Sequence, residues 1–156
     1  MTPFETPHHV CLIVYDVDRT VAFYESVGIG PWLDYPPLDE YTRLEVPDES
    51  AFRAMRFRAC QIGPLQLQVG QPGHGDSPYR RFLDEHGEGV FHIGFVVDEV
   101  DQGEATATAL GLGLLMRGRR EDGSGFTYFD VADRSGGIQL SLRQGATRGG
   151  DTDHDR

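Results

Sequence analysis

Basic residues, cysteines and long apolar runs are all scarce in this chain, and each shortage excludes a class of protein. Only 14 Lys and Arg stand against 25 Asp and Glu among 156 residues, which gives a formal net charge of −11. Nucleic-acid binding depends on cations that neutralise phosphates, so this balance argues against a nucleic-acid partner. No apolar run approaches the length of a membrane span, and the first residues lack the basic and apolar regions of a secretion signal.

The two cysteines, Cys11 and Cys60, do not form a spacing typical of a metal site. Reduced thiols and a cytoplasmic location are the expectation that follows. The chain is long enough to bury the core of one compact domain, which we expect over 1–144. The polar segment 145–156 has no apolar anchor, so we expect it to be a disordered tail and exclude His154 from any site.

An internal repeat is the most informative feature that the chain does contain. Residues 8–31 align without a gap on residues 91–114, and this alignment places His9 over His92. A second match closes each copy, where GPLQLQVGQ aligns with GGIQLSLRQ. A repeat of this kind indicates two similar units in tandem.

We therefore predict one module over 7–72, a second over 90–144, and a linker helix over 77–86. Apolar runs and glycine positions indicate a strand, a helix and then several strands in each module. The segment 36–50 contains prolines and acids with little periodicity, so it is predicted to be a long loop. The expected strands are 9–15, 31–35, 53–62, 64–70, 90–97, 114–118, 126–131 and 137–143, and the expected helices are 18–27 and 98–110.

Alternation along these strands gathers uncharged polar side chains on one face, because residues two apart point the same way. The other face of each strand is apolar enough to lie under helices. A solvated polar face would carry Lys and Glu, so neutral polar groups suggest a pocket instead. His8 is predicted to point away from His9, toward the surface. The gathered residues are His9, His92, Gln66, Gln68, Gln139 and Ser141.

These units resemble the vicinal oxygen chelate superfamily, which includes glyoxalase I, methylmalonyl-CoA epimerase, extradiol dioxygenases and the bleomycin- and fosfomycin-resistance proteins. The resemblance covers residues 7–144, and the strings GIGPW, SPYRRFLDEHGEGVFHIGF and FDVADRSGGIQLSL are most similar to its epimerase-like, glyoxalase-4 branch. It implies an α+β fold, in which two tandem βαβββ modules form a curled mixed sheet with a cup-shaped cavity and helices outside. It also implies a homodimer.

The resemblance further implies a divalent metal, such as Co, Mn, Fe, Ni or Zn, in the cup. Carried over residue by residue, its ligands are His9, Gln68 and His92, whereas the Glu of the last strand is replaced by Ser141. Neutral ligands do not offset the charge of the metal, so this site should bind metal more weakly than one with a carboxylate. It should also be a stronger Lewis acid once an anionic substrate oxygen joins it. Loss of the metal is the alternative.

In the epimerase-like branch the metal stabilises an enolate while a base moves a proton next to a carbonyl. The resemblance thus implies a metal-assisted isomerase, epimerase or lyase that acts on a small acyl or secondary-metabolite substrate. Because Ser141 replaces the Glu, methylmalonyl-CoA epimerase activity itself is not favoured. The catalytic base is unidentified, and Glu45, in the long loop, is a candidate that no motif supports.

Two other functions stay open at this point. A metal-free protein that binds or sequesters a small molecule, as in bleomycin resistance, would suit a neutral pocket with aromatic side chains. An extradiol-type dioxygenase is less favoured, since its iron requires a carboxylate ligand. Arginines near 53–58 and 117–120 are expected at solvated strand edges, with anion binding as the alternative. The substrate-binding candidates are Gln66, Gln139, Ser141, Phe57 and Tyr128.

Overall fold

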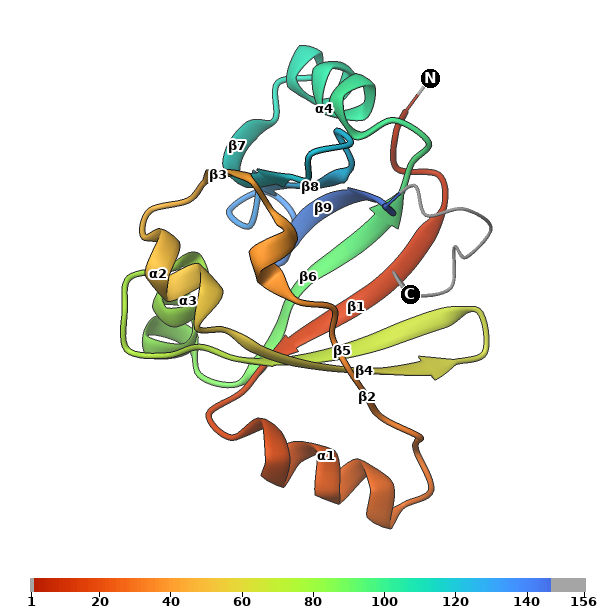
Figure 1. Cartoon of the computed structure of the whole chain (residues 1–156), viewed down its shortest axis with the longest axis vertical. Helices are drawn as coiled ribbons and strands as arrows, with labels where there is room; N and C mark the ends of the chain where they lie inside the picture. Colours follow the sequence, from red (N-terminus) through yellow and green to blue (C-terminus); the bar gives the residue numbers. More distant parts are fainter. Residues whose placement is uncertain (1, 147–156) are drawn as a thin grey trace.

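Nine strands form one curled mixed sheet in the computed structural model, which describes residues 2–146 (Figure 1). The strands are β1 (Pro7–Ile13), β2 (Leu33–Asp34), β3 (Arg43–Glu45), β4 (Arg56–Ile62), β5 (Leu65–Gln71), β6 (Gly89–Val96), β7 (Gly113–Arg119), β8 (Gly125–Asp130) and β9 (Gln139–Gln144). Their order is β2-β4-β5-β1-β6-β9-β8-β7-β3. The first strands of the two modules, β1 and β6, therefore pair at the centre in antiparallel orientation.

Each first strand also pairs in parallel with the last strand of its own module, β1 with β5 and β6 with β9. The two modules thus meet within one chain, and their polar strand faces curve toward a common interior. This arrangement confirms the expected α+β fold. The expected tail from 147 onward, with His154, lies outside the described residues.

Side-chain caps fix where the helices begin. The helices are α1 (Val17–Ser26), α2 (Glu49–Arg53), α3 (Pro78–His86), α4 (Val100–Ala109) and the short 3-10 turn η1 (Leu38–Glu40). Asp16 caps α1, and Ser77 caps α3 directly before a proline at its first position. Helix α3 lies where the linker helix over 77–86 was predicted.

The repeated glutamines Gln71 and Gln144 act as a further pair of helix caps. The side-chain oxygen of Gln71 accepts a hydrogen bond of 2.9 Å from the backbone N–H of Val17, where α1 begins. Gln144 accepts an equal bond of 2.9 Å from Val100, where α4 begins. This part of the repeat therefore serves the fold, since it satisfies an N–H that a helix start leaves without a partner.

The prediction of a long loop over 36–50 is wrong in part. This segment contains η1, the edge strand β3 and the start of α2, which Asp48 caps through a bond of 3.1 Å to the N–H of Ala51. Strand β3 pairs with β7, so a segment of the first module closes the far edge of the second. Alternation cannot predict a three-residue edge strand, because too few residues define its period.

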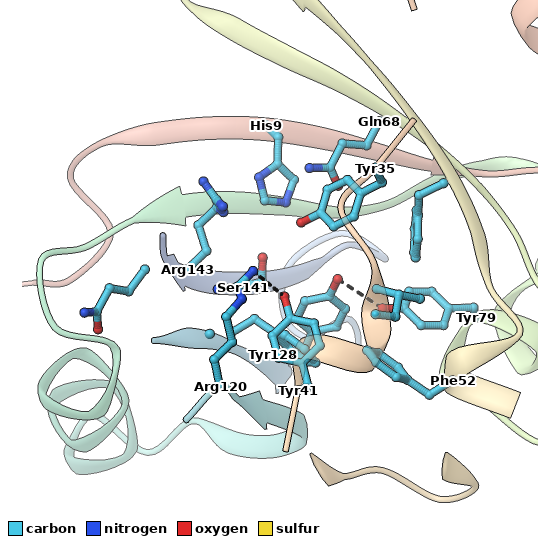
Figure 2. A pocket seen from close by; sticks show the side chains of 15 residues that line it. His9, Tyr35, Tyr41, Phe52, Gln68, Tyr79, Arg120, Tyr128, Ser141 and Arg143 are labelled. Atoms are coloured by element: carbon cyan, nitrogen blue, oxygen red, sulfur yellow. Dashed lines mark hydrogen bonds between the residues drawn. The ribbon is translucent and has the colours of Figure 1, made fainter. Parts of the chain in front are cut away.

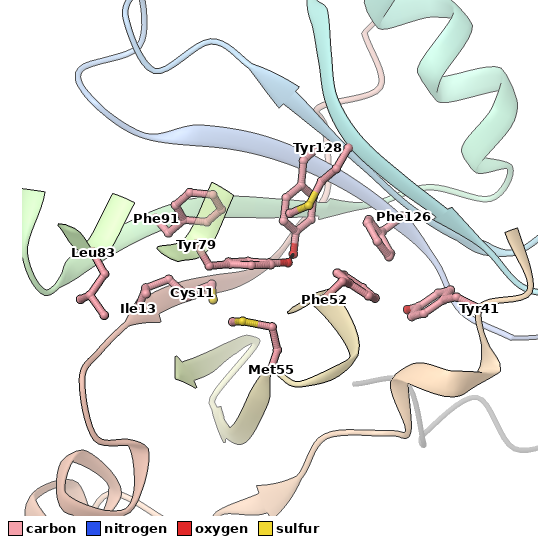
Figure 3. Close-up of a cluster of buried hydrophobic side chains, with 11 residues drawn as sticks. Cys11, Ile13, Tyr41, Phe52, Met55, Tyr79, Leu83, Phe91, Phe126 and Tyr128 are labelled. Atoms are coloured by element: carbon pink, nitrogen blue, oxygen red, sulfur yellow. Dashed lines mark hydrogen bonds between the residues drawn. The ribbon is translucent and has the colours of Figure 1, made fainter. Parts of the chain in front are cut away.

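Helices α1 and α4 cover the outer faces of the two modules, as expected (Figure 1). Helices α2 and α3 differ, because their side chains enter the cluster on the concave face. Phe52 from α2 and Tyr79 and Leu83 from α3 pack there with Cys11 and other strand residues (Figure 3). The inner face of the sheet is thus partly filled with aromatic side chains. Within residues 2–146, no helix is long and apolar enough to cross a membrane.

Candidate functional site

Two buried histidines meet where the modules join. His9 on β1 and His92 on β6 lie on paired central strands, and their Nε2 atoms are 2.9 Å apart. The rings are nearly perpendicular, with an angle of 89° between them. The duplication therefore brings the two equivalent imidazoles into direct contact.

Gly94 provides the space for the ring of His9. It lies opposite His9 in the β1–β6 register, and a Cβ atom built on it would be 2.0 Å from Cε1 of His9. The duplicated position in the first module is Cys11, which lies opposite His92. The histidine pair is therefore packed asymmetrically, and only the His9 side depends on the absence of a side chain.

His8 belongs to the site, and the prediction that it points away from His9 is wrong. Its Nδ1 is 2.8 Å from Nδ1 of His9. Its Nε2 is 3.1 Å from a guanidinium nitrogen of Arg143. The β1–β6 register shifts between Pro7 and His9, so simple alternation fails at this point of the strand.

The hydrogen bond from Arg143 determines which ring nitrogen of each histidine carries the proton. A guanidinium only donates, so Nε2 of His8 accepts and the proton of the neutral His8 ring lies on Nδ1. His8 then donates to Nδ1 of His9, and the Nε2–H of His9 donates to Nε2 of His92. The remaining proton of His92 lies on Nδ1, a buried atom that has no hydrogen-bond partner in the described part of the chain. Arg143 thus sets the tautomers of three histidines.

Both central imidazoles are neutral near pH 7. Burial lowers the pKa of His9 well below its usual range, and the neighbouring His92, His8 and Arg143 lower it further. Burial lowers the pKa of His92 to about 3. Neutral imidazole is the form that binds a metal ion and the form that accepts a proton.

Gln68 and Ser141 lie beside His9 in the lining of one cavity, whereas His92, the other histidine of the carried-over ligand set, is fully buried and is not part of that lining (Figure 2). Gln68 donates a hydrogen bond of 2.7 Å from Nε2 to Oε1 of Gln66. The hydroxyl oxygen of Ser141 is buried and has no hydrogen-bond partner within residues 2–146. An orphaned buried oxygen of this kind indicates a missing partner, because leaving it unpaired costs about 1–3 kcal/mol.

This donor set fits a divalent metal in geometry and only weakly in charge. Two adjacent ligand atoms that are each about 2.0–2.1 Å from one metal lie about 2.9–3.4 Å apart, and the observed 2.9 Å is at the lower end of this range. The nitrogen and oxygen donors suit Co, Ni, Zn or Fe. However, residues 2–146 hold no group of three His, Cys, Asp or Glu that could bind a metal, so a two-histidine, one-carboxylate iron site is not formed.

The cavity is a narrow space of about 500 Å³, including its open mouth. Of the proposed binding residues, Phe57, Tyr128 and Ser141 line it. The side-chain oxygen of Gln66 already accepts the hydrogen bond from Gln68. Gln139 lies outside the lining, where its side-chain oxygen accepts bonds from the backbone N–H groups after β8.

Glu45, the candidate base, is not brought to this cavity. It lies on the edge strand β3, where it is exposed and 3.8 Å from Arg117. The expectation of solvated arginines is wrong for Arg119 and Arg120, which are buried. Arg119 pairs with Asp101 and Glu104, whereas Arg120 enters the cavity lining.

Two tyrosines form a hydroxyl pair inside the cavity. Tyr79 donates to the hydroxyl of Tyr128 at 3.1 Å, and the ring of Tyr128 packs against His92 with a centroid separation of 4.5 Å. Burial raises the pKa of both hydroxyls well above the usual range, so both stay protonated. Tyr79, Tyr35, Tyr41 and Arg143 were not predicted as site residues, because only the fold brings their separate segments together.

Comparison with known proteins agrees with this geometry. A family model described as Glyoxalase/Bleomycin resistance protein/Dioxygenase superfamily matches residues 8–129. A methylmalonyl-CoA epimerase variant from Streptomyces coelicolor, solved with 2-nitronate-propionyl-CoA, is 26% identical, with a TM-score of 0.68 over 92% of this chain and 99% of the other. The epimerase from Mycobacterium tuberculosis, at 20% identity, has the same fold, with a TM-score of 0.67 over 94% and 91%.

A relative found by sequence similarity gives no functional information. The uncharacterized protein YqjC of Bacillus subtilis is 27% identical over 89 residues, which are 56% of this chain and 54% of that protein. The match thus spans about half the length of that relative.

Proposed function

This chain belongs to the Glyoxalase/Bleomycin resistance protein/Dioxygenase superfamily, and we propose that it is an isomerase, epimerase or lyase that stabilises an enolate next to a carbonyl with the help of a divalent metal. Its substrate is a small acyl compound or secondary metabolite. The observation that carries the proposal is the pair of buried imidazoles, whose Nε2 atoms are 2.9 Å apart and of which His9 lines the cavity.

His9, His92 and Gln68 would hold the metal, with Ser141 beside them. When bound, the metal would supply a Lewis acid that favours the charge of an enolate oxygen. Tyr128 adds a hydroxyl that remains protonated and reaches the same cavity, so it is suited to donate a hydrogen bond to that oxygen. The aromatic walls exclude water, which strengthens each of these interactions.

Proton exchange at the α-carbon tests this function. The protein is loaded with Co²⁺ or Zn²⁺, and a panel of small acids, keto acids and acyl thioesters is followed by NMR in D₂O. We expect exchange with at least one compound and its loss in His9→Ala/His92→Ala. Exchange that persists in the double variant, or its absence across the panel despite bound metal, would contradict the proposal.

His8 is expected to weaken metal binding. The metal would need the lone pair of Nε2 of His9, so the proton of that ring would move to Nδ1, where it would face the Nδ1–H of His8. In His8→Asn the side-chain oxygen accepts that proton, and we predict Zn²⁺ binding about tenfold tighter by calorimetry. His8→Leu is the control, since it removes the conflict without providing an acceptor. Affinity equal to or weaker than wild type in His8→Asn would refute this role.

A metal-free binding protein is the second candidate, favoured by the absence of a carboxylate from the cavity lining among the described residues. Sequestration needs a pocket and no Lewis acid. Removal of metal with EDTA discriminates the two candidate functions. A binding protein keeps its affinity for its ligand without metal, whereas the proposed enzyme loses proton exchange at the α-carbon.

A further inference from the structure

The hydrogen-bonding side chains of the cavity differ in whether the fold already uses them. Arg120 is paired with Glu40 at 3.3 Å, and Arg143 is 3.1 Å from the ring of His8. Gln144 accepts a hydrogen bond from the start of α4. These groups are held by the fold, whereas two buried hydroxyls on neighbouring strands can still donate.

Ser141 carries the first of these hydroxyls. Its oxygen is buried in the cavity lining, and within residues 2–146 it has no hydrogen-bond partner. Ser77, another buried serine, differs, because its hydroxyl accepts the N–H of Arg80 at 3.0 Å and caps α3. Folded proteins pair nearly all of their buried polar groups. The hydroxyl of Ser141 therefore suits a partner that the described fold does not provide.

Tyr128 carries the second hydroxyl. It shares one hydrogen bond of 3.1 Å with the hydroxyl of Tyr79, and both side chains are buried. Two hydroxyls carry two protons, and the bond between them uses only one. With Tyr79 as the donor, the proton of Tyr128 has no acceptor among the residues that the structure describes. The rings of Phe126 and His92 pack against Tyr128 at centroid distances of 5.2 and 4.5 Å, and such surroundings strengthen a hydrogen bond.

The two hydroxyls belong to one wall of the cavity. Tyr128 on β8 and Ser141 on β9 are paired in register, and both side chains line the cavity (Figure 2). The Cβ atoms of such a pair lie about 4.5–5.5 Å apart. The group that matches two donors is an oxygen that only accepts. Aromatic surroundings favour a neutral carbonyl oxygen, since burial of a charged oxygen costs more.

From these observations we propose that Tyr128 and Ser141 bind the carbonyl oxygen of a compact ketone or acyl ligand. Seven of the 15 lining residues are Phe or Tyr, so a flat group next to the carbonyl gains ring contacts beyond simple burial. This inference rests on the proposed function for the reaction at the α-carbon, but it concerns binding and is measured on metal-free protein without turnover.

Calorimetry with two compounds of the same shape tests the role of the oxygen. Acetophenone has a carbonyl oxygen and α-protons, and α-methylstyrene has a methylene group in place of that oxygen. The ratio of their dissociation constants is compared between proteins, so the difference in hydrophobicity of the two compounds cancels. We expect the preference for acetophenone to fall roughly tenfold in Tyr128→Phe and in Ser141→Ala, as for the loss of one hydrogen bond in each.

Two variants outside the cavity are the controls. Ser77→Ala and Tyr15→Phe remove one hydroxyl each, and both should keep the wild-type preference. No measurable binding of acetophenone to the wild-type protein, or an unchanged preference in Tyr128→Phe or Ser141→Ala, overturns the inference.

The carbonyl stretch of bound acetophenone measures the hydrogen bonds directly. It is isolated by subtracting the infrared spectrum of a complex with isotopically labelled acetophenone. We expect a lower frequency than in hexane, with a shift toward the hexane value in Tyr128→Phe and in Ser141→Ala, because hydrogen bonds weaken the C=O bond. A wild-type band at the hexane frequency would show that neither hydroxyl reaches the oxygen, and the proposal would be wrong.

Stability separates a hydroxyl that serves a ligand from one that serves the fold. Ser141→Ala should have an unfolding midpoint equal to or above that of wild type, because it removes a buried group without a partner. Ser77→Ala should have a lower midpoint, since α3 loses its cap. A Ser141→Ala protein that loses as much stability as Ser77→Ala would show that the hydroxyl of Ser141 serves the fold.

The two proposals can fail independently. Acetophenone binding that depends on both hydroxyls, without proton exchange in any compound, would leave the carbonyl site standing and refute the enzyme. Proton exchange that depends on the histidines, with a preference for acetophenone that neither hydroxyl variant changes, would do the reverse.

Discussion

The free energy of unfolding of the metal-free protein is expected to fall by about 2.5 kcal/mol between pH 7 and pH 5.5 because of His9 and His92. Burial keeps both imidazoles neutral in the folded state, where the pKa of His92 is about 3. In the unfolded chain both rings take up a proton as the pH drops below about 6.5. Since the unfolded state then binds more protons, stability is complete above that pH and is lost progressively toward pH 3.

Urea unfolding at a series of pH values, in the presence of EDTA, measures this effect. His92→Gln should lose about half of the pH dependence, because one of the two buried rings is gone. His86→Gln, at an exposed histidine, should keep the wild-type slope. A stability that is constant from pH 7 to pH 5.5 would show that the two rings are not buried as a neutral pair.

Gly94→Ala is expected to cost about 3 kcal/mol of stability, at the upper end of the range for overpacked sites. The new Cβ would lie 2.0 Å from Cε1 and 2.2 Å from Nε2 of His9, so the ring must leave its place. His9 has no free space to enter, because His8 and His92 contact it on both sides. The substitution should therefore break the histidine pair as well as lower the stability.

Gly113→Ala is the matched control, because it is also on a strand and a Cβ there would meet nothing within 4 Å. We expect its unfolding midpoint to stay close to that of wild type. A Gly94→Ala protein as stable as Gly113→Ala, with unchanged metal affinity, would contradict the close packing of His9 on Gly94.

The central features of the fold could be predicted because they occur in both copies of the internal repeat. The duplication identified His9 and His92 as equivalent positions, and the central pairing of β1 with β6 brings them together. The elements β4 to β9 also lie close to their predicted ranges, since their alternation extends over six to eight residues. Long periodic segments carry enough information to define a face.

The residues that surround the histidine pair could not be predicted in the same way. The register shift in β1 turns His8 toward His9, and alternation gives no sign of such a shift. Gln139 does share a face with Ser141, but its amide is used by the turn after β8. Arg143 and Tyr41 are far apart in sequence, and their place beside His9 depends on how β3 and β9 close the second module.

Metal content tests the central claim most directly. The protein is purified without chelators, and its metals are measured by plasma mass spectrometry beside His9→Ala/His92→Ala and the control His74→Ala. We predict near-stoichiometric Co, Mn, Fe, Ni or Zn in wild type and in the control, and none in the double variant. A wild-type protein that is empty and takes up none of these metals when they are added would contradict a metal-assisted mechanism.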